Sequence, residues 1–380
     1  MTRQQPATTL SLPATAPRGF SLIELMLALG LGLVVVTGIV QLFIGNSQTY
    51  TVLNGQSRLQ ENARFGFEFI TQAARSAGFF GCAPEDVNVV NGLNAPNWSV
   101  VPEFDVSAPV QGYDGRGGGN WQPALATLPR TTGGGANANV YIGGNGIDIG
   151  EVVDNTDVLV LRAMVQPVRR LTQVLQPTDD PVVEAPGGDN AFEVGDIIMI
   201  ADCEQAAVVR VTGAAVAAGE ATLAHAVGGA GLYENSATVD IPTQVGAPRT
   251  LSAVGRSFGP ESLVGEVVSS FFYIAPGAAV NNRGDAINAL WRKQGSAAPQ
   301  ELIAGIDDMQ VLYGIDTTLA DNVANANQYV AADAIPDPNQ VVSLRVTLAV
   351  NSVDAVTEDG NQLTRTFTKT ILLRNAQPGA

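Results

Sequence analysis

Residues 25–44 read LMLALGLGLVVVTGIVQLFI, a run of twenty residues that contains no charge. Only Thr37 and Gln41 in this run are polar. A helix needs about twenty apolar residues to cross the ~30 Å hydrocarbon core of a bilayer. The run therefore predicts a single membrane-spanning helix near the N-terminus, with the lipid bilayer as its surroundings.

The residues that precede this run are basic and contain no acid. Residues 1–19 hold Arg3, Arg18 and three prolines. A secretory signal also places basic residues before apolar ones, but its apolar run is shorter and ends in small residues before a cleavage site. Here the run is too long and continues into further helical sequence, so we expect no cleavage behind it. On composition alone, a plain signal-anchor helix explains the segment.

The junction between these two parts reads Arg18-Gly19-Phe20-Ser21-Leu22-Ile23-Glu24. It resembles the type IV prepilin motif, in which a dedicated membrane peptidase cuts after the glycine and methylates the new N-terminus. The resemblance implies a leader of residues 1–19, cleavage between Gly19 and Phe20, and N-methylation of Phe20. It also implies that Glu24 acts in assembly, by pairing with the cationic N-terminus of a neighbouring subunit.

Elementary electrostatics gives Glu24 a second explanation. An unpaired carboxylate at the edge of an apolar span costs several kcal/mol. In the first turn of its own helix, the macrodipole favours an acid by roughly 0.3–1 kcal/mol. The two explanations are compatible, but only pairing with a neighbour accounts for the twenty apolar residues that follow the acid.

The helical pattern continues beyond the apolar run. Apolar residues recur at three- and four-residue spacing over 59–77, which marks one face of a helix, while Arg58, Glu61 and Glu68 belong to the other face. Gly78 is a plausible end. We therefore predict a helix over residues 20–77, with its membrane span at about 25–44 and an amphipathic stalk behind it.

The remainder, residues 78–380, is predicted to be a β-rich head. Residues 83–155 are rich in Gly, Asn and Pro and show no helical period, so they are expected to be loop with short strands at most. Strand-like segments bounded by turn residues occur at 157–163, 196–201, 206–212, 266–275, 289–295 and 309–316.

The clearest strand is 342–350, which alternates apolar and polar residues and so predicts a half-buried strand of an antiparallel sheet. Residues 365–375 are expected to pair with it across the turn at 358–361. The predicted fold class is α+β: a long N-terminal helix packed on an antiparallel sheet with long loops.

Four segments of this chain are similar to the PilW group of minor pilins. They are SRLQENARFGFEFI…ARSAGFFGC (57–82), ADC (201–203), LIAGIDDMQVLYGID (302–316) and TILLRN (370–375). The resemblance implies a pilin-like fold, with a helical stalk and a β-rich head. It implies a low-abundance subunit that helps to prime type IV pilus assembly at or near the tip, and so supports twitching motility.

The resemblance also implies partners and a location. The partners are the prepilin peptidase, other minor pilins, the major pilin and the inner-membrane assembly platform. Before assembly, the chain would be a single-pass protein of the inner membrane with a periplasmic head, and afterwards part of the pilus at the cell surface. Two alternatives remain: a minor pseudopilin of a type II secretion system, or a tip adhesin that binds through residues 83–155.

The two cysteines, Cys82 and Cys203, are predicted to form a disulfide. This follows if the head lies outside the cytoplasm, where disulfides persist. Closing a loop of about 120 residues stabilises a fold by roughly 4–5 kcal/mol in the chain-entropy model. Two free buried thiols are the alternative.

Composition argues against several other functions. The net charge is −16, which disfavours nucleic-acid binding by phosphate neutralisation. One histidine and two cysteines are too few for a zinc module. Residues 255–259 match G-x-S-x-G, but Pro260 follows and the only histidine, His225, precedes the serine, so we expect no hydrolase elbow.

No cofactor, metal or enzymatic activity is therefore predicted. His225 is expected to be a partly buried loop or strand residue. The acidic turns at 154–157 and 358–361 lack the spacing of an EF-hand and are expected to be solvated.

Overall fold

The computed structural model describes residues 19–81, 88–94, 106, 108–118, 120–123, 152–176, 179–228, 233–240, 257–294, 297–318, 324–357 and 359–375. Its contacts divide the chain into two compact units, which meet between Leu53 and Asn54. Each unit is described by itself below.

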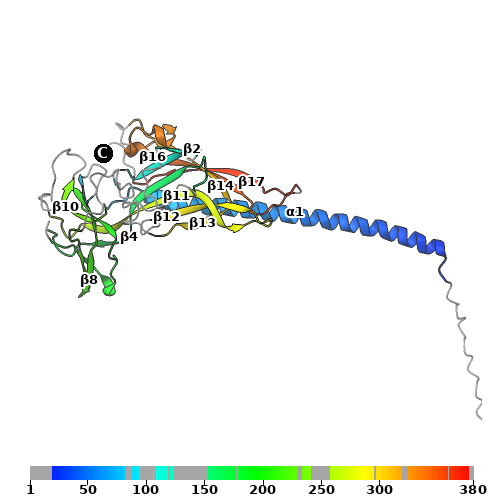
Figure 1. Ribbon diagram of the computed structural model, residues 1–380, viewed down its shortest axis with the longest axis horizontal. Coiled ribbons are helices and arrows are strands. Elements are labelled where there is room, and N and C mark those ends of the chain that lie inside the picture. Colours follow the sequence, from blue (N-terminus) through cyan, green and yellow to red (C-terminus); the bar gives the residue numbers. More distant parts are fainter. Residues whose placement is uncertain are drawn as a thin grey trace, which may run out of the picture. The chain divides into compact units, whose positions relative to one another are not determined.

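Helix α1 (Leu22–Ser76) is 55 residues long and runs through the boundary between the two units (Figure 1). Residues 25–44 of this helix are apolar on every side, and their large apolar side chains are exposed. An 18-residue window of this helix is long and apolar enough to cross a membrane. A helix that is hydrophobic all round needs an apolar environment, which a bilayer supplies.

The second part of α1 is amphipathic, as the spacing predicts. Its buried face carries Leu59, Ala63, Phe67, Ile70 and Ala74, each less than 9% exposed, and Ala77 behind the helix is buried as well. The helix ends at Ser76, and Gly78 follows with a φ of +77°. Because a left-handed φ is cheap only for glycine, Gly78 ends the helix as expected.

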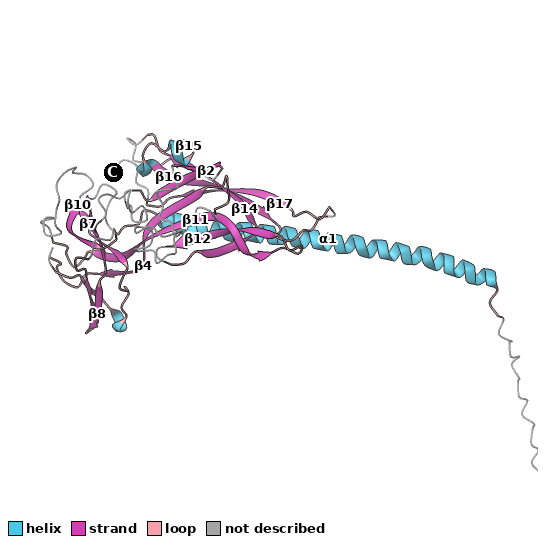
Figure 2. Ribbon diagram, in the orientation of Figure 1, coloured by secondary structure: helices cyan, strands magenta, loops and turns pink. Residues whose placement is uncertain are grey.

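The described residues of the head form three sheets, and strands dominate the part of the chain that follows α1 (Figure 2). The largest sheet has ten strands, antiparallel except where β1 pairs with β7. In pairing order they are β10 (Asn235–Asp240), β1 (Asn88–Leu93), β7 (Gln205–Arg210), β6 (Ile197–Ala201), β11 (Leu263–Val280), β4 (Val158–Arg170), β2 (Val110–Gly117) and β3 (Asn120–Gln122), with β12 (Ala286–Gln294) and β13 (Gln300–Ala304) branching from β11.

Strand β11 has 18 residues, which is long enough to pair with three other strands of this sheet. Strand β4 pairs along one edge of it, from Leu263 to Phe272. Strand β6 pairs with Leu263–Glu266, and β12 pairs with residues from Ser270 onward. Since a strand has only two edges, β6 and β12 follow one another along the second edge of β11.

A second sheet has four antiparallel strands, β15 (Gln328–Val330), β14 (Ile306–Ile315), β16 (Val341–Asn351) and β17 (Thr364–Leu372), in that order. A third consists of β5 (Val182–Glu184), β9 (Glu220–Ala224) and β8 (Gly213–Ala217). Short 3-10 helices lie at η4 (Pro186–Gly188), η7 (Ala332–Ala334) and η8 (Pro338–Gln340).

The largest hydrophobic core joins α1 to the four-stranded sheet and to part of the ten-stranded one. Leu59, Phe67 and Ile70 of the helix pack there with Leu344, Val346 and Leu348 of β16 and with Phe272 and Leu290 from β11 and β12. The second part of α1 is therefore a central element of the head's largest core, against which strands of both larger sheets pack. The α+β class predicted from the sequence is confirmed.

All eight strand segments predicted from the sequence are strands, and β16 and β17 pair antiparallel as expected. Strands β1, β2 and β3 lie within 83–155, where the sequence predicted loop with short strands at most, and β2 runs for eight residues. On β16, Ser343 departs from the predicted alternation because it is fully buried. Its hydroxyl lies 3.1 Å from the Tyr329 hydroxyl, which satisfies it.

Candidate processing and assembly site

The residues around the predicted cleavage point begin helix α1. Gly19 and Phe20 are exposed and precede it, and Ser21 is the residue just before its first turn. The backbone N–H of Glu24 donates to Ser21 Oγ at 3.2 Å, and the backbone N–H of Ser21 donates to Glu24 Oε2 at 3.3 Å. This reciprocal pair is a capping box, which satisfies two backbone donors of the first turn.

The capping box gives Glu24 a partner within its own chain. Its carboxylate also accepts from the Ser21 hydroxyl at 3.4 Å. A carboxylate held in this way is oriented toward the start of the helix, where a new α-amino group at Phe20 would form after cleavage. Ser21 was not singled out from the sequence, although its signal, a serine three residues before a glutamate at a helix start, is readable there.

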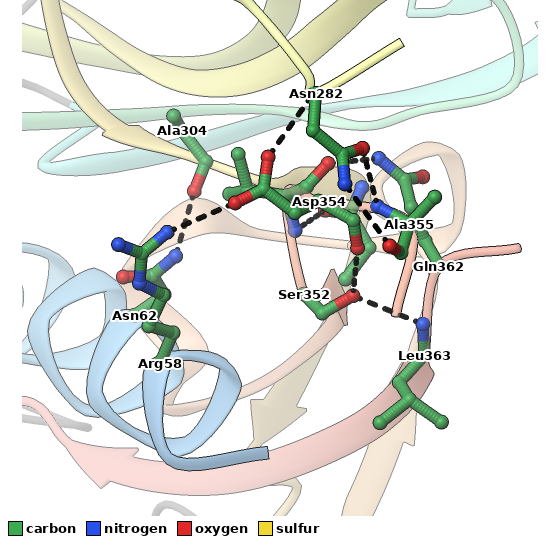
Figure 3. Close-up of polar contacts among 11 residues, drawn as sticks. Arg58, Asn62, Asn282, Ala304, Ser352, Asp354, Ala355, Gln362 and Leu363 are labelled. Atoms are coloured by element: carbon green, nitrogen blue, oxygen red, sulfur yellow. Dashed lines mark hydrogen bonds and ion pairs between the residues drawn. The ribbon is translucent and has the colours of Figure 1, made fainter. Parts of the chain in front are cut away.

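Within the second unit, α1 enters the head through a set of polar contacts with two loops (Figure 3). We call these the stalk-entry loops, residues 281–285 between β11 and β12 and residues 352–357 after β16. Arg58 pairs with Asp354 at 3.1 Å, and Asn62 donates to the Ala304 carbonyl at 3.0 Å. Arg58 thereby fixes the second of these loops to the helix, and Asn62 fixes the end of strand β13.

Asn282 joins the stalk-entry loops to one another. Its side chain donates to the Ala355 carbonyl at 3.1 Å and accepts from the Ala355 backbone N–H at 3.0 Å (Figure 3). Its own backbone N–H donates to Asp354 at 3.1 Å. Asp354 is therefore shared between the helix and the first loop, which makes it the centre of this arrangement.

The far end of the stalk is held by a buried arginine. Arg162 on β4 is fully buried, and its guanidinium donates to the Ala108 carbonyl and to Gln111 Oε1, both at 2.6 Å. Its backbone carbonyl accepts from the N–H of Gly78 at 2.9 Å. Arg162 thus connects the residue that ends α1 with strand β2.

A buried carboxylate joins the two larger sheets. Asp157, 4% exposed, accepts from the backbone N–H of Gly115 at 3.0 Å and of Val311 at 2.8 Å. Burial raises the pKa of Asp157 to about 6, and the carboxylates of Asp114 and Asp308 act in the same direction. The expectation that the turn at 154–157 is solvated is therefore wrong for Asp157.

The YGID segment of the predicted family motif lies at the same junction. Tyr313 of β14 is fully buried, and a Cβ on Gly112 of β2 would lie 1.8 Å from the Tyr313 hydroxyl oxygen. Only glycine fits at position 112. The tyrosine therefore specifies how closely β2 and β14 approach each other.

The other predicted site residues are not brought together into a reactive group. His225 follows β9 and is half-buried, with its Nδ1 3.1 Å from Asp180, which agrees with the sequence interpretation. Ser257 is exposed and precedes β11 without a helix behind it, while residues 255 and 256 lie outside the described residues. Among the described residues, no group of three His, Cys, Asp or Glu side chains suits a metal ion.

The predicted disulfide lies partly outside the described residues. Cys203 follows β6, but residues 82–87 are not among those described, so the pairing of Cys82 with Cys203 stays a prediction. The same holds for most of the glycine-rich stretch 83–155, and for the predicted leader up to residue 18.

Comparison with known families bears on both ends of the chain. The family model described as prokaryotic N-terminal methylation motif matches residues 16–40. The family model described as type IV pilus-assembly protein W, PilW, matches residues 272–372, which span the end of β11 through β17. No curated protein and no solved structure matches the chain.

One match covers the start of helix α1, and the other covers the C-terminal strands of the head. A prepilin-type N-terminus begins a long apolar helix, and that helix continues into a β-rich head, which is a pilin-like arrangement. The second match covers the four-stranded sheet together with β12, β13 and part of β11. It confirms the resemblance inferred from the sequence: the chain matches a PilW-family type IV pilin.

Proposed function

We propose that this protein is a minor pilin that helps to prime type IV pilus assembly and enters the filament at or near its tip. The observation that carries this proposal is the pairing of a methylation-motif N-terminus with a PilW match in the head. The matching family is that of a type IV pilus-assembly protein, which favours the pilus over a type II secretion system. Support of twitching motility follows from the same role.

The proposal assigns each part of the N-terminal segment a step. Prepilin peptidase would cut between Gly19 and Phe20 and methylate Phe20. The apolar part of α1 would hold the subunit in the inner membrane, with the head in the periplasm, until it is drawn into the filament. Glu24 would then exchange its bond with Ser21 for the methylated N-terminus of a neighbouring pilin, which carries the opposite charge.

The role of the chain as a structural subunit follows from this class of protein, and its partners would be other minor pilins, the major pilin and the assembly platform. The N-terminus itself is a substrate of the peptidase. Apolar side chains exposed over Phe20–Leu53 supply the surface through which neighbouring helices would pack in the filament core.

The test is a deletion strain scored for surface pili and complemented with variants of the first turn. We expect few or no pili in the deletion strain and recovery with the wild-type gene. Glu24→Ala protein should be cut at Phe20, as the mass of its N-terminal peptide would show, yet be missing from sheared pili.

Two matched variants separate pairing from helix capping. Ser21→Ala removes the cap, at a cost of about 1 kcal/mol, but keeps the carboxylate, so it should still enter pili. Glu61→Ala removes an exposed acid from the stalk half of the same helix and should behave as wild type. Normal pilus numbers in the deletion strain would defeat the priming role, and normal incorporation of Glu24→Ala would defeat the pairing.

A further inference from the structure

Strand β17 is an open edge of the four-stranded sheet, with β16 on one side and no described strand on the other. It has nine residues, whereas the other strands that end a sheet, β3, β5, β8, β10, β13 and β15, have three to six. Among the described strands that end a sheet, β17 is therefore the longest.

This edge lacks three of the devices that prevent strand addition in natural sheets, because it is not short, bulged or interrupted by proline. The charged side chains that it does carry, Arg365 and Lys369, lie on one side of the sheet. The sequence of β17, TRTFTKTIL, contains neither proline nor glycine, and its nine pairs with β16 run from Thr364 to Leu372 without a shift of register. The strand is a regular template along its whole length.

The residues that face the open edge follow from the strand alternation. The backbone N–H of Leu373 donates to the Val342 carbonyl at 3.0 Å, so odd-numbered residues direct their peptide groups to β16. Even-numbered residues direct theirs outward. These are Thr364, Thr366, Thr368, Thr370 and Leu372, none of them charged and all of them exposed.

The side of β17 that faces α1 carries positive charge, although the chain as a whole is acidic. Arg365 and Lys369 lie opposite the buried Val350 and Val346, hence on the side of the sheet that faces α1. Lys369 Nζ contacts the Thr71 hydroxyl at 3.0 Å. Residues 360–375 contain three basic residues and no acid, in a chain whose net charge is −16.

No ion pair joins these basic residues to an acid within the described part of the chain. Lys369 is half-buried and its recorded partners, the Thr71 hydroxyl and the Phe67 ring, are neutral. A half-buried cation gains most from an added carboxylate, because the surrounding dielectric is lower than in water.

We propose that β17 accepts an extended strand from a different protein, added along its open edge, with acidic side chains at two positions four residues apart. Side chains directly opposite in a sheet share a face, and Arg365 and Lys369 are themselves four residues apart. The two acids would therefore meet the two basic residues, while Thr364, Thr366, Thr368 and Thr370 would pair through their backbone.

A second copy of this chain is a poor occupant. Two β17 strands side by side would bring their basic residues to the same edge, and like charges opposite each other destabilise a sheet. Strand addition takes affinity from backbone hydrogen bonds and specificity from alternate side chains, so the acidic partner is selected by charge. Residues 19–24 take no part in this surface, and the inference does not rest on the proposed function.

The test measures peptide binding by the purified full-length protein in detergent. The probe is a labelled nine-residue peptide of sequence TETVTETVT. Its threonines stand at the odd positions, and its two glutamates are four residues apart. The control peptide replaces both glutamates by lysine. We expect saturable binding of the acidic peptide, weakened by salt, and no binding of the basic one.

A matched pair of variants at one residue isolates the backbone of the edge. Thr368→Pro removes an outward N–H, whereas Thr368→Val keeps it, and both lose the hydroxyl contact with Thr347 at 3.0 Å. Because the N–H of residue 368 points away from β16, proline is tolerated there. Thr368→Pro should weaken binding of the acidic peptide roughly tenfold relative to Thr368→Val, with equal thermal midpoints.

Three outcomes would overturn the proposal: no binding of the acidic peptide to the wild-type protein, equal binding of the two peptides, or equal binding by the two variants. Arg365→Glu combined with Lys369→Glu provides a further arm. This double variant should bind the lysine peptide more tightly than the glutamate peptide. Binding of the acidic peptide unchanged by that reversal would count against the assigned partner chemistry.

Discussion

At the scale of single residues, the head keeps several carboxylates where water is scarce. Asp157 is held by two backbone donors from different sheets, so its buried oxygens are satisfied. Glu266 on β11 is different, because its side chain has no hydrogen bond within the described part of the chain and it lies half-buried beside β6. Burial raises the pKa of Glu266 to about 7, and the carboxylates of Asp196 and Glu193 add to this effect.

Glu266→Gln is therefore expected to stabilise the head at neutral pH and above. A carboxyl whose pKa rises from 4.5 to about 7 on folding binds its proton more tightly in the native state. The wild-type protein thus loses stability as the pH rises from about 4.5 to 7, and glutamine removes that loss. We expect a gain of roughly 1–3 kcal/mol at pH 8.

The measurement is the unfolding midpoint of both proteins in detergent across this pH range. The difference between them should shrink steadily below about pH 7 and vanish near pH 4, where the wild-type carboxyl is protonated in both states. Glu220→Gln, an exposed acid on β9, is the control and should change stability by less than about 0.5 kcal/mol at any pH. A gain that does not depend on pH would show that Glu266 acts through packing instead.

At the scale of elements, the fit of α1 against the sheets is set by small residues on its buried face. A Cβ on Gly66 would lie 3.1 Å from Ile306 Cδ1 and 3.3 Å from Leu348 Cδ1. Both atoms are the ends of flexible side chains, so one methyl group is accommodated by small shifts. Larger groups would push the helix away from β14 and β16.

Gly66→Val is accordingly expected to destabilise the head by about 1–3 kcal/mol, the usual cost of overpacking a core. Gly66→Ala should be nearly neutral, because better helix propensity, worth up to about 1 kcal/mol, offsets the tight contact. Glu68→Val places the same side chain on the exposed face of the helix as a control. Thermal unfolding in detergent ranks the three, and a Gly66→Val midpoint equal to that of Glu68→Val would contradict the close fit.

Periodicity explains which elements were predictable from the sequence. The stalk face of α1 and the alternation of β16 were readable because each buries one side against a core. The six short strands β5, β8, β9, β10, β13 and β15 were missed, because strands of three to six residues show too little alternation to be recognised. The burial of Asp157 and the fit of Tyr313 over Gly112 also depend on how two sheets meet, which no local pattern records.

The N-terminal site was predictable for a different reason. Its motif is contiguous, from Arg18 to Glu24, so the proposed cleavage point and the start of α1 lie in one short segment that can be read directly. The stalk-entry loops were not predictable, because Arg58 and Asp354 are separated by 296 positions in the chain. A surface ion pair of this kind carries no sequence signature, although it fixes where the helix enters the head.

At the scale of the whole molecule, the predicted bridge between Cys82 and Cys203 would connect the residues just behind α1 with the loop after β6. The two cysteines enclose about 120 residues, which include β1 to β6. Closing a loop of this length lowers the entropy of the unfolded chain and stabilises the fold by roughly 4–5 kcal/mol at most. Cys203→Ser should therefore lower the unfolding midpoint of the wild-type protein, and addition of a reductant to the wild type should lower it to the same value.

Thiol-specific labelling before and after reduction provides the independent measurement. We expect the unreduced, unfolded wild-type protein to take up no label and the reduced protein to take up two, one on each cysteine. The reductant should leave the midpoint of Cys203→Ser unchanged, because that variant has no bridge to open. Full labelling of the unreduced wild-type protein would rule out the bridge and leave the core around α1 to hold β6 and the stalk together without a covalent link.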